Sequence, residues 1–458
     1  MRLHANKMKV STLLITVALG GCQLAPEYQR PDSELPVQFS RISEQQPDAV
    51  PALNEPVLAQ LIDKALDKNR DLAIAATSIE QALIALGVRQ GATLPDLDLN
   101  AGARRSRRTD YGAVAMPGDP VTNNFQSGLS SSYLIDWWGR NQQAINMAEA
   151  EVKIAELTLS NARRLIKQLV ATHYFSLRSI DKQLAVTKGT IASYEATLQL
   201  MSTRVANGLA SELEYYVVEE ALEATKTRVF SLQEQRSLAE NQLALLLADN
   251  AFSLSAKPKY AITLPQAPHP GLPADLLLNR ADIQAAEYRL KQANANIGLA
   301  KAALYPSIYL TGSLGQESAD LSDLLKSGAR IWNVGIGLDL PIFDGNERKA
   351  AVKAATLNQQ QAIQSYQQTV ANAFLDVSNA LSQWRLRSDA IPHYQARLDA
   401  ATRALKLAKS RYELGYSSYL ELLETQRNVD SAQLALIQQQ ELRVMAWIGL
   451  VTALAGDM

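Results

Sequence analysis

Few side chains in this sequence have the types and spacing that catalysis requires. Zinc sites need His or Cys ligands at short defined spacings, and phosphate-binding loops need closely spaced glycines before a lysine. Neither pattern occurs, and no nucleophile elbow is present. The histidines are scattered along the chain at His4, His173, His269 and His393. We therefore expect no enzyme activity, no catalytic residue, no metal site and no cofactor.

The residue with the most specific chemical expectation is Cys22, the only cysteine. Basic residues and a short apolar run precede it, as in a secretory signal peptide. Leu19-Gly20-Gly21-Cys22 resembles a bacterial lipobox, in which the cysteine is acylated, for example with palmitate, and becomes the mature N-terminus. A plain signal peptide with a chance cysteine is the alternative. Because Gln23 follows rather than aspartate, the resemblance to lipoproteins favours sorting to the outer membrane.

A cluster of arginines is the second group of chemical interest. It lies near the tip of a predicted strand hairpin and consists of Arg104, Arg105, Arg107 and Arg108. Guanidinium groups bind phosphates in a bidentate geometry, so the cluster could face lipopolysaccharide phosphates. A solvated loop would have the same composition, and both interpretations stay open.

Composition excludes some classes of protein. The formal net charge of -1 gives no sign of nucleic-acid binding. Apart from the N-terminal stretch, we see no apolar run of the roughly 20 residues that a membrane helix needs. Any membrane crossing would then have to be made by strands.

The element that must position most side chains is a helix predicted over residues 140–205. About 66 residues at roughly 1.5 Å each give a rod of about 100 Å, far longer than a globular core requires. Its apolar residues alternate in steps of three and four, which is the spacing of a coiled-coil seam. These residues are Ile145, Ala148, Val152, Ala155, Leu159, Ala162, Ile166 and Leu169.

The chain then repeats itself. Arg204 to Glu214 corresponds to Arg411 to Glu421, and several weaker matches follow in the same order. Each half reads helix, two strands, long helix, turn and return helix. The predicted segments are a signal peptide (1–21), an extended lipidated tether (22–56), repeat 1 (57–248, with return helix 211–247), a bridge (249–279) and repeat 2 (280–458, with long helix 347–413 and return helix 418–455).

The predicted strands alternate apolar and polar residues over about 10 positions, as membrane barrel strands do. They cover residues 94–104, 125–135, 305–315 and 331–340. A half-buried soluble sheet has the same pattern, but rods of about 100 Å leave little to cover it. Single-chain barrels start at about eight strands, so four must pair with identical chains.

Together these features resemble the TolC family of outer-membrane efflux channels, most closely the lipoprotein branch that serves resistance-nodulation-division drug pumps. The resemblance rests on the lipobox, the duplicated unit and the motifs at 136–140, 341–345 and 411–415. It implies a homotrimer with a 12-stranded barrel in the outer membrane, anchored by lipid, and a helical tunnel through the periplasm. It also implies two partners, a periplasmic adaptor protein and an inner-membrane pump.

The resemblance also suggests roles for the turns between helices. It assigns adaptor docking to the turns around Gly208, Leu209, Ala210 and Ser211 and around Gly415, Tyr416 and Ser417. It places the periplasmic gate near Leu420 and Glu424, which share one helix face because they are four residues apart. Rings of leucine and carboxylate would close the pore and select cations, although the family has aspartate where this chain has Glu424. The alternative is that Leu420 is a core residue and Glu424 a solvated surface charge. Arg411 and Tyr412 would then form a latch to the neighbouring helix pair.

Other functions remain open at this point. A structural or adhesive coiled coil without a pore would not need the alternating strands. Among ducts, type I protein secretion and metal-ion efflux are the alternatives to drug export. Metal export could leave clusters of methionine or histidine along the lumen, but the seven methionines are scattered.

The lipobox gives a first testable prediction. We expect Cys22→Ser to abolish incorporation of labelled fatty acid and to weaken anchoring, because the thiol is the acylated atom. Barrel insertion should survive, since strands provide a second hold on the membrane. Fatty-acid labelling of the wild type and the variant checks this, and unchanged incorporation in the variant would rule the lipobox out.

Overall fold

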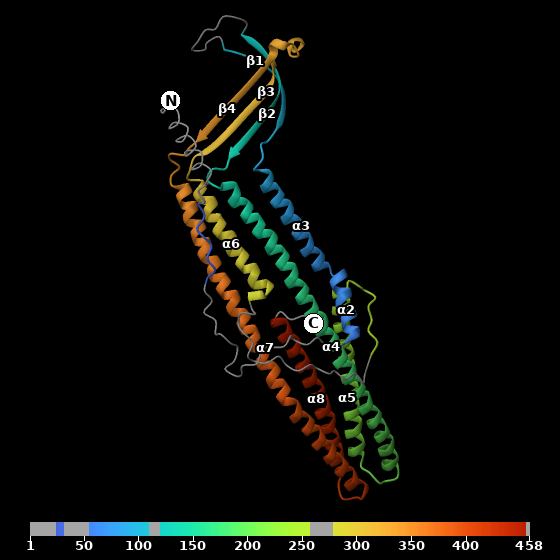
Figure 1. Cartoon of the computed structure of the whole chain (residues 1–458). Coiled ribbons are helices and arrows are strands. Elements are labelled where there is room, and N and C mark those ends of the chain that lie inside the picture. The colour runs from blue at the N-terminus through green and yellow to red at the C-terminus, as the bar shows by residue number, and fades with distance from the viewer. Residues whose placement is uncertain (1–23, 32–54, 110–119, 257–277, 455–458) are drawn as a thin grey trace. The chain divides into compact units, whose positions relative to one another are not determined.

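The computed structural model describes residues 24–31, 55–109, 120–256 and 278–454 (Figure 1). Cys22 lies outside these residues. The chain divides into two compact units. Unit 1 consists of residues 1–32, 78–156 and 285–367, and unit 2 of residues 33–77, 157–284 and 368–458.

Long helices make up most of the described chain. α4 and α7 are each 67 residues long, and each is followed by a return helix of 35 residues. α7 continues through Pro392 to its end. The helices are α2 (Pro56–Lys68), α3 (Arg70–Gly91), α4 (Arg140–Ala206), α5 (Glu212–Leu246), α6 (Ala281–Ala302), α7 (Glu347–Glu413) and α8 (Tyr419–Ala453).

The predicted seam of α4 is correct over its first part and wrong at its end. Val152, Leu159 and Ile166 are buried, but Leu169 is 43% exposed. The buried face moves on to Val170 and its neighbours instead. A straight helix drifts by about 20° per heptad relative to a strict seven-residue repeat, so a fixed seam leaves the core after several turns.

α3 corrects the expectation about membrane helices. Among the described residues it is the one helix long and apolar enough to cross a membrane by length and composition, with a mean hydropathy of 1.4 over 18 residues. Only 11% of that window is buried. Ile74, Ile84 and Val88 are each at least 65% exposed. The helix itself was predicted at about residues 71–90, but Thr77, Ser78, Glu80 and Gln81 interrupt its apolar residues, so no continuous apolar run stood out.

The sheet of unit 1 has four antiparallel strands in the order β1-β2-β3-β4. The strands are β1 (Asp98–Arg107), β2 (Val121–Ile135), β3 (Ser307–Ser318) and β4 (Arg330–Asp339). β1 thus begins later than the predicted residue 94, because residues 92–97 form a turn and an extended lead-in after α3. β2 pairs with β3 across the two halves of the sequence, for example through Leu129 and Leu314.

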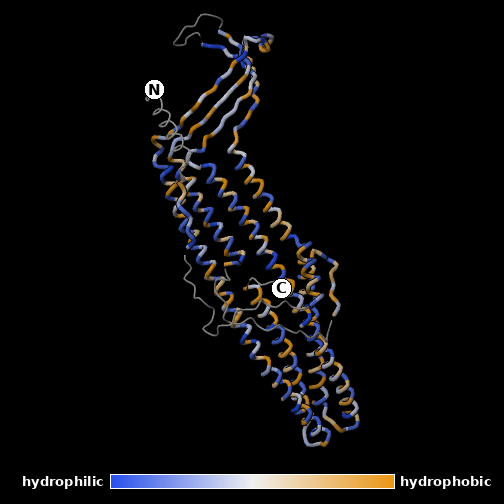
Figure 2. Tube along the Cα trace, in the orientation of Figure 1, coloured by the Kyte–Doolittle hydropathy of each residue, from blue (hydrophilic) through white to orange (hydrophobic). Residues whose placement is uncertain are grey.

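One face of this sheet is apolar and solvent-exposed in the single chain. The registry aligns Leu99, Leu129, Leu314 and Trp332 in one row across all four strands. Leu99, Leu314 and Trp332 are each more than 60% exposed. Figure 2 shows the alternation of apolar and polar residues along the strands. In a soluble protein other parts of the chain would pack on such a face, whereas in a membrane protein lipid can cover it.

Within unit 2, a cluster of buried arginines binds the last backbone carbonyls of α8. Arg280 is 4% exposed, and it donates to the carbonyl of Ala453 (3.0 Å) and to Asp282 (2.7 Å). Arg164 of α4 donates to the carbonyl of Thr452. Burial alone would raise the pKa of Asp282, but the bond from Arg280 keeps that pKa below its ordinary value. The cations therefore satisfy carbonyls at the C-terminus of α8 that the helix itself leaves free.

The close approach of β2 and β3 at Gly315 gives a second prediction. A Cβ on Gly315 would lie 2.6 Å from the carbonyl oxygen of Ser127 and 2.9 Å from Cα of Gly128. We expect Gly315→Ala to force β2 and β3 apart at a cost of about 1–3 kcal/mol. Gly337→Ala is the matched control, because a Cβ at Gly337 meets nothing within 4 Å. The temperature at which detergent-resistant oligomers dissociate measures the effect, and equal temperatures for both variants would contradict it.

Candidate functional site at the turns of the two helical hairpins

Two helical hairpins, α4–α5 and α7–α8, end in turns of the same construction. Gly208 and Gly415 have φ values of +68° and +78°, in the left-handed region that glycine adopts without strain. The amide of Leu209 donates to the carbonyl of Arg204, and the amide of Tyr416 donates to that of Arg411, both at 2.8 Å. This is the Schellman pattern, which satisfies carbonyls at the C-terminus of a helix.

The sequence-predicted tip residues lie in these turns. Leu209 is 70% exposed in the first turn, and Leu414 and Tyr416 are 70% and 76% exposed in the second, so both turns present large side chains to solvent. Ala210 packs partly against the core beneath the turns. Ser211 and Ser418 begin the return helices as their N-cap residues, and Ser417 lies half-buried next to Ser418.

The two return helices begin differently. Ser211 and Glu214 form a capping box, in which each side chain bonds the backbone amide of the other residue. Ser418 makes no side-chain cap bond. Its third-following residue, Glu421, instead approaches Arg411 with 3.3 Å between Oε1 and Nε. Equivalent glutamates of the two repeats thus have different partners.

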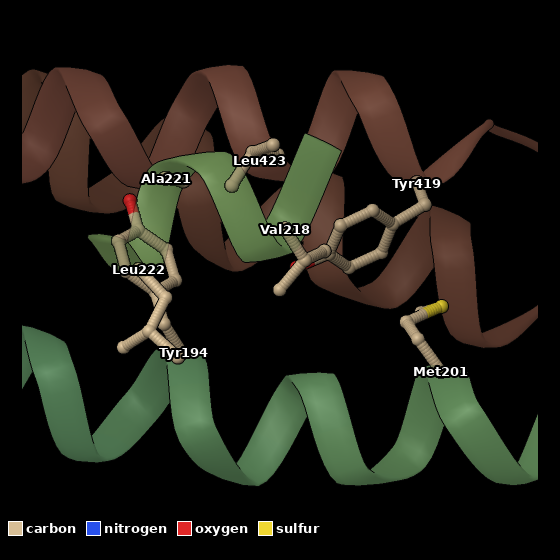
Figure 3. Packing of buried hydrophobic residues seen from close by; sticks show 7 residues of the cluster. All are labelled: Tyr194, Met201, Val218, Ala221, Leu222, Tyr419 and Leu423. Atoms are coloured by element: carbon tan, nitrogen blue, oxygen red, sulfur yellow. The ribbon is translucent and has the colours of Figure 1, made fainter. Parts of the chain in front are cut away.

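A hydrophobic cluster fixes the two hairpins to each other just behind the turns (Figure 3). The side chains come from three helices and point toward one another. They are Tyr194 and Met201 of α4, Val218, Ala221 and Leu222 of α5, and Tyr419 and Leu423 of α8. All are at most 5% exposed, so separating the hairpins here would expose apolar surface.

The polar contact beside this cluster joins α4 to α7. Arg204 donates to the hydroxyl of Tyr412, and its guanidinium carbon lies 5.4 Å from the centre of the ring. Tyr412 also meets the ring of Tyr419 edge-on at 5.6 Å. Burial raises the pKa of Tyr412 and Arg204 lowers it, with a net rise, so the hydroxyl remains protonated near neutral pH.

Arg411 and Tyr412, predicted together as a latch, thus lie in different environments. Tyr412 contacts the other hairpin of the same chain through Arg204. Arg411 contacts its own hairpin, through Glu421 and the carbonyl of Tyr416. Arg204 was not among the predicted latch residues, although the repeat aligns it with Arg411.

Leu420 and Glu424 share an exposed face of α8. Leu420 is 45% exposed, and Glu424 is also exposed. Their neighbours Tyr419 and Leu423 occupy the buried face, at 5% and 3% exposure. Packing within the chain therefore leaves this pair available for contacts with something outside the chain.

Two further contacts between the hairpins were not predicted. Arg427 of α8 pairs with Glu220 of α5 at 2.7 Å, and Thr190 of α4 donates to Asp430 of α8 at 3.1 Å. Burial raises the pKa of Asp430 more than the bonds from Thr190 and Gln426 lower it. These groups line a polar cavity of about 630 Å³ between α4, α5 and α8.

The segment that follows Cys22 is held in unit 1. Ala25 lies against Gly298 of α6, where an added Cβ would come within 2.7 Å of the Ala25 Cβ. Asn294 donates to the carbonyl of Pro26 at 2.8 Å, and Arg30 pairs with Glu287 at 2.7 Å. The start of the predicted tether is therefore docked on α6.

Comparison with known proteins agrees with this architecture. The family model for outer membrane efflux protein matches residues 61–249 and 272–456. The chain is 32% identical to the probable outer membrane lipoprotein SilC of Salmonella typhimurium, over 98% of this chain and 99% of SilC. It is 33% identical to the outer membrane protein OprJ of Pseudomonas aeruginosa, over 98% and 95% of the two chains.

Solved structures show the same fold. CusC, described as forming a transmembrane channel, superposes with a TM-score of 0.86 at 30% identity, over 95% of this chain and all of CusC. The CmeC outer membrane channel of Campylobacter jejuni has a TM-score of 0.88 at 26% identity, over 95% of each chain. The predicted fold class, mainly helical with four strands per chain and two repeats, is confirmed. The chain belongs to the outer membrane efflux protein family and is a channel protein of the outer membrane.

Proposed function

We propose that this chain is the exit duct of a tripartite multidrug efflux system. The observation that carries the proposal is the combination of an exposed apolar sheet face with two exposed glycine turns in one chain. The sheet suits a membrane, and the turns offer a surface on which a periplasmic adaptor protein can dock. The adaptor would in turn connect the duct to an inner-membrane pump of the resistance-nodulation-division class.

The duct is a homotrimer in this proposal. β1 pairs with β2 and β4 pairs with β3, and among the described residues neither outer strand has a second partner. Unpaired strand edges are not tolerated in lipid, and single-chain barrels begin at about eight strands. Three chains of four strands each give 12 strands, which is enough for a closed barrel.

The proposed cargo is drug-sized organic molecules. The polar face of the sheet consists largely of Ser, Thr, Asn, Gln and Gly, which suit chemically varied solutes. Metal-cation efflux is the second candidate, because relatives include the cation efflux system protein CusC of Escherichia coli at 31% identity. The exposed Glu424 would also suit cations. Protein secretion is a further alternative.

Docking at the turns gives the test of this function. Proline cannot adopt the φ of +78° at Gly415 or of +68° at Gly208. In a strain that depends on this channel, we expect Gly208→Pro or Gly415→Pro to abolish drug resistance while oligomers remain in the outer membrane. The minimal inhibitory concentrations of drugs and of copper or silver salts measure it.

The alternatives have distinct outcomes in this experiment. Loss of metal resistance with unchanged drug resistance would favour the cation duct. Gly328→Pro is a control outside the turns, since Gly328 lies in the β3–β4 connection. Normal cross-linking of the Gly415→Pro variant to its adaptor would contradict docking at this turn.

The gate gives a further prediction. If Leu420 and Glu424 face the symmetry axis, each chain adds one leucine and one carboxylate to a constriction. Leu420→Ala combined with Glu424→Ala should then raise single-channel conductance several-fold and reduce cation preference, because acidic rings select cations. Planar bilayer recordings with salt gradients measure both quantities.

The internal repeat supplies a matched control for the gate. Leu213 corresponds to Leu420 and is also exposed, at 64%, whereas Val217 replaces Glu424. Leu213→Ala should leave conductance and ion preference unchanged. The same conductance in wild type and in the Leu420 and Glu424 double variant would exclude a gate at this position.

A further inference from the structure

The charges of the sheet are sorted between its two faces. The registry places odd-numbered residues of β1 and β2 and even-numbered residues of β3 and β4 on one face, here called the apolar face. Its row of Leu99, Leu129, Leu314 and Trp332 spans the sheet. The other residues of the four strands form the polar face.

The only charged residues on the apolar face of these strands are arginines. They are Arg105, Arg107 and Arg330, and all three are exposed. The carboxylates of the same strands, Asp98, Glu317 and Asp339, lie on the polar face. Arg104 also lies on the polar face, opposite Asn124. A face that meets lipid thus has cations and no anions.

Arg105 and Arg107 lie together at the end of the sheet that leads into residues 108–120. From Ile308 to Ser318 the apolar face extends over 10 residue steps, and Ser318 pairs with Phe125 next to Ala103. At about 3.3 Å per step and a tilt near 40°, this spans about 25 Å, the height of an apolar barrel band. Arg105 and Arg107 lie one and two rows beyond this band. Arg330 pairs with Gln316, one row inside the Ser318 end of the band and on the opposite edge strand, so it stands apart from Arg105 and Arg107.

This position corresponds to lipid headgroups. α3, α4, α6 and α7 all adjoin the opposite end of the sheet. Since the helices belong to the periplasmic part of the proposed duct, the arginine end lies at the outer surface of the membrane. Guanidinium groups pair with phosphate oxygens in a bidentate geometry, which ammonium groups cannot match. A cation row above an apolar band therefore complements an amphiphile with acyl chains below and phosphates above.

We propose that Arg105 and Arg107 form a binding surface for the phosphate groups of a phosphorylated glycolipid in the outer leaflet. The inference rests on the proposed barrel. The register assigns three of the four clustered arginines to faces of the sheet, and Arg108 follows the end of β1. Arg105 and Arg107 lie on the apolar face, which meets lipid, whereas Arg104 lies on the polar face.

The test uses the purified full-length oligomer in nanodiscs that contain bis-phosphorylated lipid A or its dephosphorylated form. We expect the wild type to retain lipid A through delipidation, measured by native mass spectrometry, and to lose the dephosphorylated form. Arg105→Gln combined with Arg107→Gln should weaken retention at least about tenfold, since each arginine near an anionic surface contributes about a fivefold effect. Added inorganic phosphate should not compete at millimolar concentration, because it lacks acyl chains.

Arg104→Gln is the matched control, because it removes the same charge from the same strand on the other face. It should leave lipid A retention unchanged. Equal losses in the Arg104 variant and the double variant, or equal retention of both lipid forms by the wild type, would overturn the proposal. Heat-modifiable oligomer bands are measured in parallel. Their absence from the wild type would contradict the barrel itself, whereas their presence without lipid discrimination would contradict only the lipid surface.

Discussion

The structure depends on one constraint, the two free edges of its four-stranded sheet. β1 and β4 each pair with one neighbour among the described residues, and one of the two exposed faces of each strand is largely apolar. A free edge in lipid leaves amide and carbonyl groups without hydrogen bonds, at several kcal/mol for each group. The single chain is therefore an incomplete unit of a larger assembly. The close contact of Gly128 with Gly315 joins the two sequence halves within that unit.

In the helical unit 2, buried arginines likewise supply hydrogen bonds to backbone carbonyls that would otherwise have none. Arg280 and Arg164 bond the last carbonyls of α8, and Asp282 balances them. In the same unit, Asp181 is 3% exposed and accepts from Arg236 at 2.9 Å, while Arg236 also donates to the carbonyl of Leu254. Breaking one partner of such buried pairs leaves an uncompensated charge, so these clusters fix where helices end and loops begin.

Local patterns predicted much of the fold. The alternation at Ile308 and Leu310 indicated a strand, and Gly208 and Gly415 indicated the turns, because both signals act over a few residues. Contacts between distant residues were not predictable in the same way. The sequence could not pair Arg204 with Tyr412, which are 208 positions apart. The spacing of four residues was enough to place Leu420 and Glu424 on one helix face. It did not indicate what that face contacts.

The unequal starts of the two return helices have a consequence for the duplicated sequence. In the first hairpin Glu214 caps its own helix, and in the second Glu421 turns to Arg411. Tyr412 corresponds to Val205, and Glu424 corresponds to Val217. A recombinant gene that carried the first half twice would encode two well-capped hairpins, but neither would have a tyrosine to accept from Arg204. The two halves therefore share the backbone geometry of their turns but differ in the side chains that join the hairpins, so the second half cannot be replaced by a copy of the first without losing the Arg204–Tyr412 contact.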